Sequence, residues 1–199
     1  MSSMNNQTRE KILNAAWRLL EAAPTKGVRM SDIAKEARLS RQALYLHFPT
    51  RAELLVATAR YLDEVKDVEQ RLLASRRAET GLARLHAFID AWGNYIPEIY
   101  GVAKAFLAMQ ATDEAVALAW DDRMRAVREG CQAAVEALKK DGVLSPDHGE
   151  AQATDILWTL LSLRNWEQLT RDCGWSQQRY IATTKLIATR VLLRDAAAD

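Results

Sequence analysis

Two helix-start signals stand close together in this sequence, at Ser40 and at Thr50, with Pro49 between them. A serine or threonine side chain can cap the first amides of a helix, and Glu53, three residues after Thr50, completes a capping box. Proline disfavours helical geometry at the preceding residue, so a helix that starts at Ser40 has to end at Phe48. The sequence therefore predicts a very short helix, followed at once by a second one.

The residues before Ser40 predict two further helices. An apolar stripe that includes Ile12, Ala16 and Leu20 favours a helix from about Thr8 to Ala23, ended by the stretch PTKG at 24–27. Ser31 can cap a short helix over 31–37, and a tight turn then leads to Ser40. Two short helices joined by a three-residue turn and packed on a longer helix describe a helix-turn-helix unit.

The remainder of the chain is also predicted to be helical, because 8 glycines and 4 prolines in 199 residues leave few breaks. Ser145 and Pro146 resemble an N-cap and a first helical position, Gly174 is a stop, and Ser176 is a cap. The helices expected after Thr50 cover approximately 50–75, 78–95, 97–109, 112–140, 145–173 and 176–193. We therefore expect an all-α chain of about nine helices.

Charge is distributed unevenly along the chain. The first 60 residues carry ten Lys and Arg against five Asp and Glu, which is +5, whereas the remainder carries −4. A basic N-terminal part suggests a polyanionic partner for that part alone. Ordinary scatter of charge explains the numbers equally well when they are taken by themselves.

The short helix after Ser40 has the side chains of a DNA-reading element. Leu44 and Phe48 share one face and must pack inward, which leaves the other side chains on the outer arc. Arginine can bond guanine, glutamine can bond adenine, and alanine or leucine can contact the thymine methyl group. Tyrosine, histidine and a nearby arginine can donate to phosphates. The predicted contacts are Arg41, Gln42, Ala43, Tyr45, Leu46 and His47, together with Arg51 at the start of the next helix.

The run VRMSDIAKEARLSRQALYLHFPTRAELL, residues 28–55, resembles the DNA-binding signature of the tetracycline-repressor (TetR) family of transcriptional regulators. The resemblance covers about residues 8–56, and it rests on Ile33-Ala34, Ala37, Leu39-Ser40, Leu44-Tyr45, His47-Phe48 and Arg51 before Glu53-Leu54-Leu55. It implies a helix-turn-helix DNA-binding domain over 1–50 and a ligand-binding and dimerisation body over 51–199. It also implies DNA contacts by Ser31, Arg41, Gln42, Ala43, Tyr45, Leu46, His47 and Arg51.

The turn departs from the family pattern at one position. The family usually has alanine, glycine and a hydrophobic residue there, whereas this chain has Ala37, Arg38 and Leu39. If residue 38 adopts positive φ, its side chain adds roughly 1 kcal/mol of strain. A phosphate contact by Arg38 would offset this strain, although a solvated arginine is the simpler interpretation.

Aromatic residues of the second part are candidates for an effector cavity, because such cavities are lined mostly by apolar and aromatic side chains. Plain core packing explains any single one of them equally well. The predicted ligand-binding residues are Trp92, Phe106, Trp120, Met124 and Trp158.

Residues 156–163 are apolar on almost every face of a helix, so this helix has to be buried on every face. In a chain of this size, one face is then expected to meet a second subunit. The last helix offers a matching stripe, and together the two helices could form a four-helix bundle across a two-fold axis. The predicted interface residues are Leu157, Leu160, Leu161, Ile181, Ala188 and Val191.

Other classes of protein find little support in the sequence. The histidines are scattered, the two cysteines lie outside any CxxC pattern, and the glycines form no phosphate loop, so we expect neither an enzyme nor a metal or other cofactor. No apolar run reaches the roughly 18–20 residues that a membrane span needs, and the first residues lack a signal-peptide core. We therefore expect a cytoplasmic protein without a membrane partner.

The expected function is a ligand-responsive transcriptional regulator, most often a repressor. It would bind a near-palindromic double-stranded DNA operator as a homodimer and be released by a small, mostly apolar or aromatic effector. The alternative is a DNA-binding protein without a small-molecule effector, in which the aromatic body is solid core. A helical ligand-binding protein that has lost DNA binding is disfavoured, because Arg41, Gln42, Tyr45 and His47 are all present.

Overall fold

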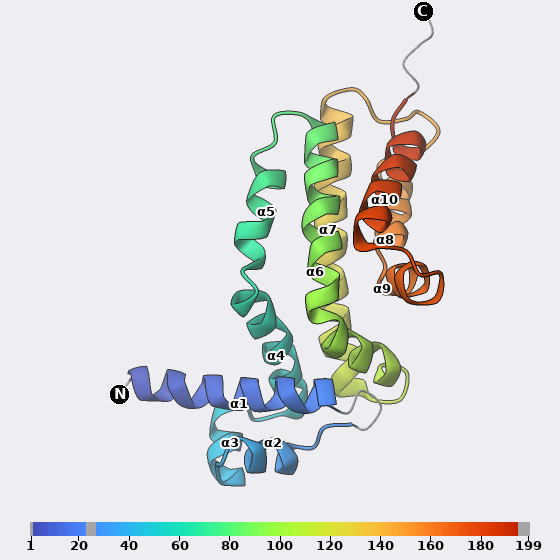
Figure 1. The fold of residues 1–199 in the computed structure, drawn as a ribbon. Coiled ribbons are helices and arrows are strands. Elements are labelled where there is room, and N and C mark those ends of the chain that lie inside the picture. The colour runs from blue at the N-terminus through green and yellow to red at the C-terminus, as the bar shows by residue number, and fades with distance from the viewer. Residues whose placement is uncertain (1, 23–26, 195–199) are drawn as a thin grey trace, which may run out of the picture. The chain divides into compact units, whose positions relative to one another are not determined.

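The computed structural model describes residues 2–22 and 27–194 (Figure 1). Throughout this part the regular secondary structure is helical, apart from one isolated β-bridge between Leu144 and Leu193, so the all-α prediction is confirmed. None of the helices in this part is both long enough and apolar enough to cross a membrane. The elements are α1 (Ser2–Ala22), α2 (Met30–Glu36), α3 (Arg41–His47), α4 (Arg51–Val65), α5 (Val68–Arg76), α6 (Gly81–Met109), α7 (Glu114–Lys140), α8 (Glu150–Leu160), α9 (Leu163–Glu167), the π-helical turn η1 (Gln168–Asp172) and α10 (Gln177–Leu192).

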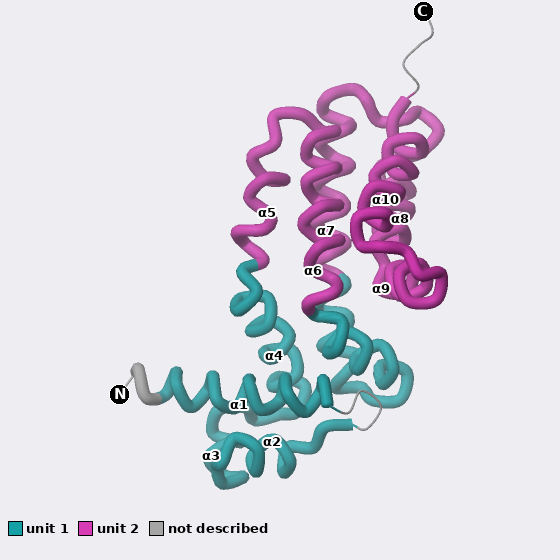
Figure 2. The backbone as a smooth tube through the Cα atoms, viewed as in Figure 1, with its two compact units in different colours: residues 1–67, 99–124 teal, residues 68–98, 125–199 magenta. Residues whose placement is uncertain are grey.

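The chain forms two compact units, shown in different colours in Figure 2. Unit 1 comprises Met1–Asp67 and Ile99–Met124, and unit 2 comprises Val68–Glu98 and Arg125–Asp199. Unit 1 thus contains α1 to α4 together with the end of α6 and the start of α7. Its core is a single apolar cluster to which each of these helices contributes, including Ile12, Leu20, Ile33, Leu44, Leu54, Phe106 and Val116.

Three of the predicted helix starts are confirmed by their capping bonds. The hydroxyl of Ser40 accepts the amide of Ala43 at 3.1 Å, and that of Thr50 accepts the amide of Glu53 at 3.1 Å. Ser176 caps α10 in the same way. Gly174, with φ of 68°, lies where the preceding helical segment ends, as predicted.

The start of the chain differs from the prediction. Helix α1 begins at Ser2 rather than near Thr8, and its predicted end at 24–27 falls mostly outside the described residues. The N-cap of α2 is Arg29 and not Ser31, which lies inside the helix. Arg29 has extended backbone and makes no side-chain capping bond, so packing of the buried Met30, Ile33 and Ala34 sets this start instead of a capping hydroxyl.

The single helix expected over 50–75 is two helices. Helix α4 ends at Val65, and Asp67 adopts a left-handed conformation with φ of 55° before α5 begins. Asp is one of the few residues besides glycine that tolerates this region, so the chain can turn there without a glycine.

The sequence predicts a helix break around Pro97. This prediction is wrong, because Pro97 lies inside α6. Proline leaves the carbonyl four residues earlier without its helical partner, and here that carbonyl belongs to Gly93. The side-chain amide of Gln177 donates to it at 2.6 Å. Gly93 also lets α10 approach, since a Cβ at this position would lie 2.8 Å from the side chain of Ile181.

The helix expected over 145–173 is interrupted and starts late. Helix α8 begins at Glu150 after Gly149, whereas Ser145 is buried and its amide bonds the carbonyl of Leu192 at 2.8 Å. A second break follows α8, where Ser162 caps α9. The indole of Trp92 donates to the freed carbonyl of Leu161 at 2.7 Å, which satisfies the broken helix end.

Candidate nucleic-acid interface

Helices α2 and α3 are joined by the turn predicted to be strained. Arg38 has φ of 55°, which is the conformation anticipated for the position where a glycine is usual. Its amide bonds the carbonyl of Lys35 at 3.1 Å, and the amide of Leu39 bonds the carbonyl of Ala34 at 2.9 Å. These bonds close the end of α2, so the chain passes from α2 to α3 without a glycine.

Helix α3 has one buried face and one exposed face. Leu44 is fully buried and Phe48, just after the helix, is 4% exposed, and both belong to the core cluster of unit 1. Leu46, two residues after Leu44, is 81% exposed, and Tyr45 is 42% exposed. The side chain of Leu46 therefore takes no part in the core, and it is accessible for a contact outside the chain.

The remaining predicted DNA contacts of the two helices lie on accessible positions. Arg41 and Gln42 are exposed in the first turn of α3, Ala43 and His47 are partly exposed, and Ser31 is exposed in the first turn of α2. The residue types therefore match those that read base edges and phosphates, and their side chains are available for contact.

Arg51 differs from the other predicted contacts. Its guanidinium donates from Nη1 to both carboxylate oxygens of Asp113 at 2.7 Å and from Nε to the carbonyl of Val28 at 2.6 Å. The side chain is 23% exposed. The sequence predicts that Arg51 contacts a DNA phosphate. In the structure, the Arg51 side chain already bonds Asp113 and Val28 inside unit 1.

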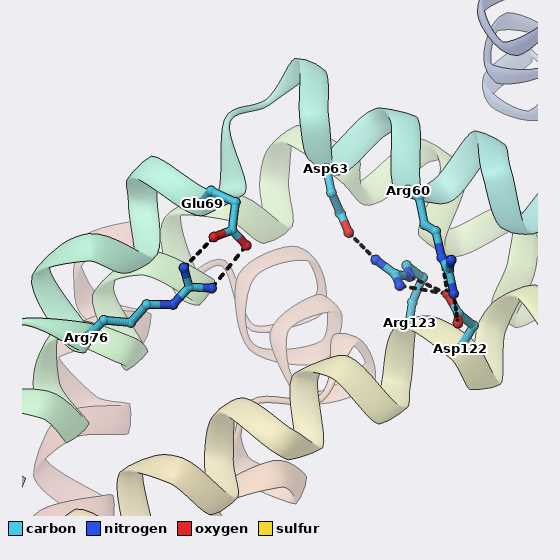
Figure 3. Close-up of polar contacts among 6 residues, drawn as sticks. All are labelled: Arg60, Asp63, Glu69, Arg76, Asp122 and Arg123. Carbon is cyan, nitrogen blue, oxygen red and sulfur yellow. Dashed lines mark hydrogen bonds and ion pairs between the residues drawn. The ribbon is translucent and has the colours of Figure 1, made fainter. Parts of the chain in front are cut away.

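Helix α4, which follows the helix-turn-helix directly, is joined to α7 by ion pairs (Figure 3). Arg60 bonds Asp122 at 2.6 Å, and Arg123 pairs with both Asp122 and Asp63 of α4. The hydrogen bond from Arg60 holds the pKa of the Asp122 carboxyl below its ordinary value. The two pairs between α4 and α7 were missed in the sequence, because residues 62 positions apart (Arg60 and Asp122) or 60 positions apart (Asp63 and Arg123) carry no local signal of their contact.

The predicted interface residues of α8 and α10 are mostly internal. Leu157, Leu161, Ile181 and Ala188 are between 0 and 9% exposed within the chain itself, so their side chains already pack inside unit 2. Leu160 and Val191 are partly exposed. The exposed apolar residues are instead Leu186 at 49% and Ile187 at 40%, on the outer face of α10.

The five predicted ligand-binding residues are divided between the two units. Phe106 is buried in the core cluster of unit 1, Trp120 packs against that cluster, and Met124 is half-buried. Trp158 of unit 2 is half-buried, and the indole N–H of Trp92 donates a hydrogen bond to the carbonyl of Leu161. Unit 2 also has a surface cavity of about 270 Å³, and none of the five residues lines it.

Comparison with known proteins shows similarity to bacterial transcriptional regulators. A family profile described as "Bacterial regulatory proteins, tetR family" matches residues 12–58, which run from the middle of α1 to the first half of α4. The HTH-type transcriptional regulator CymR of Pseudomonas putida is 31% identical over 163 residues, covering 78% of this chain and 75% of that protein.

Two further similarities agree with this result. The nucleoid occlusion factor SlmA of Marinomonas sp. is 33% identical over 64 residues, and this match spans only 32% of the length of either protein. Among solved structures, NalD, the secondary repressor of the MexAB-OprM multidrug efflux pump in Pseudomonas aeruginosa, superposes with a TM-score of 0.68 at 18% identity. That superposition covers 96% of this chain and 99% of NalD and establishes a shared fold.

Proposed function

Because this chain belongs to the tetR family of bacterial regulatory proteins, which are DNA-binding transcriptional regulators and not enzymes, we propose that it represses transcription as a homodimer on a near-palindromic operator, from which a small apolar or aromatic effector releases it. The observation that carries the DNA-binding part is the pair of faces on α3. Leu44 anchors the helix in the core, and Leu46 projects from its other side. A short helix held in this way suits insertion into a major groove.

We assign base reading to Arg41, Gln42, Ala43 and Leu46, and phosphate contacts to Ser31, Tyr45 and His47. A duplex enriched by the wild-type protein from a library of randomised double-stranded DNA serves as the operator. If the protein enriches no sequence from this library, the proposed function is wrong.

Replacement of Arg41 tests this assignment. Arg41→Ala should weaken binding to the enriched duplex by about 1–3 kcal/mol and relax base preference at one or two positions, because a bidentate bond to guanine is lost. Arg41→Lys is the matched control: it keeps the charge and should lose the same base preference. The measurement is the affinity for single-base variants of the duplex. An equal loss for all sequences, together with a flatter salt dependence, would instead identify Arg41 as a phosphate contact.

The homodimer is proposed to form through the outer face of α8 and α10, which pack against each other in unit 2. Leu186 and Ile187 replace the buried residues of the sequence-based interpretation as the principal contacts, and Leu160 and Val191 lie at partly exposed positions on the same helices. Two-fold symmetry of the protein then requires a near-palindromic operator, with half-sites about one helical turn or a multiple apart.

The effector is proposed to bind among the aromatic residues of the body and to change the orientation of α4. The candidates form two separate groups: Phe106, Trp120 and Met124 within unit 1, and Trp92 and Trp158 within unit 2. Since α4 starts one residue after Thr50 and is ion-paired to α7, a shift of α7 residues 114–124 should move α4 and the helix-turn-helix with it. If the separation of the two α3 helices of the dimer no longer matched one turn of DNA, only one of them could bind its half-site.

Effector binding should be reciprocal with operator binding. A compound that quenches tryptophan fluorescence should bind about 5- to 150-fold more weakly in the presence of the enriched duplex, and it should weaken duplex binding by the same factor. The measurement is the dissociation constant of each ligand with and without the other, and Trp92→Phe, Trp120→Phe and Trp158→Phe locate the quenched residue. Equal constants would favour the alternative function, a DNA-binding protein without an effector.

A further inference from the structure

The Arg51 side chain joins three segments of unit 1 that are distant in sequence. Arg51 is the first residue of α4, Val28 lies two residues before α2, and Asp113 immediately precedes α7. The guanidinium bonds the carbonyl of Val28 through Nε and both oxygens of Asp113 through Nη1. It therefore holds the two ends of the helix-turn-helix against the turn between α6 and α7.

Asp113 is itself fixed from the other side. Its Oδ1 accepts the amide of Val116 at 3.3 Å, so the carboxylate lies at the N-terminus of α7. Burial alone would raise the pKa of this carboxyl, but the hydrogen bonds and charge of Arg51 hold the pKa below its ordinary value. The carboxylate is thus charged at neutral pH and is shared between a helix start and the guanidinium.

The surroundings leave little freedom to this pair. The two side chains are 23% and 26% exposed, and Gly27 lies beside them, with a Cβ position 3.8 Å from Nη2 of Arg51 and 3.9 Å from the Asp113 carboxylate. A DNA phosphate that recruited Arg51 would have to replace an anion already bonded at 2.7 Å through both of its oxygens. Removal of one partner from a partly buried ion pair destabilises the protein, because the other charge is left unpaired.

We propose that Arg51 and Asp113 are positioning residues for DNA recognition: their ion pair sets the helix-turn-helix on the turn between α6 and α7, so that α3 enters the major groove in the productive orientation. Arg51 then acts through Asp113 and Val28 and not through the DNA backbone. The inference rests on the DNA-binding function proposed above and adds two residues that direct the reading helix without touching a base.

The test uses the full-length protein with two probes, the duplex enriched by the wild-type protein and a random-sequence duplex. Asp113→Asn removes the charge but keeps a good helix-capping side chain. Together with Arg51→Gln and the double variant it forms a double-mutant cycle. Glu69→Gln is the matched control, since it removes a charge-paired carboxylate that bonds Arg76 within α5 and touches neither Arg51 nor Val28.

Each single variant should weaken binding to the enriched duplex by roughly 2- to 30-fold, with the double variant no weaker than the worse single variant. Binding to the random duplex and the salt dependence should stay close to wild type, because no phosphate contact is lost. The Glu69→Gln control should change binding to the enriched duplex less than Asp113→Asn does.

The opposite result is equally clear. If Asp113→Asn leaves binding to the enriched duplex unchanged or tighter, while Arg51→Gln flattens the salt dependence by about one charge, Arg51 is a phosphate contact and the inference is wrong. Thermal unfolding of each variant is measured first, and if Arg51→Gln does not fold, Asp113→Asn alone decides. A wild-type protein that enriches no duplex would refute the proposed function, whereas an enriched duplex that Asp113→Asn binds normally would refute only this inference.

Discussion

Leu186→Glu should convert the protein into a monomer and weaken operator binding by about 10²- to 10⁴-fold. A dimer that engages two half-sites gains its second contact at a high effective concentration, and a monomer loses this gain without losing any contact of its own reading helix. Leu186 is 49% exposed on α10, so a charge there is harmless in the isolated chain but is placed against apolar surface in the proposed dimer. The measurements are the mass in solution and the affinity for the enriched duplex.

Leu118→Glu provides the matched control for this prediction. It is the same substitution at a leucine that is 52% exposed, but this leucine belongs to α7 in unit 1 and is part of neither α8 nor α10. This variant should keep both the dimeric mass and the wild-type affinity. A dimeric Leu186→Glu protein with unchanged binding would show that the subunits meet elsewhere.

Leu44→Ala should cost about 2–5 kcal/mol in the free energy of unfolding and should abolish operator binding at temperatures where the helix-turn-helix unfolds. Leu44 is fully buried in the core cluster of unit 1, so its truncation removes apolar contacts and leaves a cavity. A seven-residue helix has little stability of its own and depends on this packing. Chemical denaturation and duplex binding measure the two effects.

Leu46→Ala is the control, because it makes the same change two residues away on the same helix. Leu46 is 81% exposed, so the free energy of unfolding should stay within about 0.5 kcal/mol of wild type. Its affinity for the enriched duplex should nevertheless fall, since the proposed contact with a thymine methyl group is lost. If Leu46→Ala were as unstable as Leu44→Ala, the assignment of the two faces of α3 would be wrong.

The same contrast shows how far sequence-based prediction reached in the reading element. The caps at Ser40 and Thr50, the end of α3 before Pro49 and the inward direction of Leu44 are all local properties, decided within a few residues. Positive φ at Arg38 was considered only as a condition, and it came from the family resemblance, in which a glycine is usual at this position; the structure has φ of 55° there. Interactions between residues this close in sequence can be predicted from the sequence alone.

Where a helix breaks is predictable only when the cause is local. Pro97 is a strong breaking signal, yet α6 continues through it, because Gln177 from another helix takes over the bond that proline cannot make. The breaks at Asp67 and Ser162 carry weaker signals but occur. At Ser162, the neighbouring Trp92 satisfies the freed carbonyl.

The all-α class, the helix-turn-helix and the two faces of α3 are predictable from the amino acids alone, since each follows from capping, periodicity and the properties of proline over a few residues. The pairing of Arg51 with Asp113, the ion pairs between α4 and α7, and the burial of Leu157 and Ala188 beside an exposed Leu186 are properties of the folded chain. They could not be predicted because an ion pair between residues 62 positions apart, or the face that a helix buries, depends on which elements meet in space. Short sequence motifs carry no information about contacts between such distant elements.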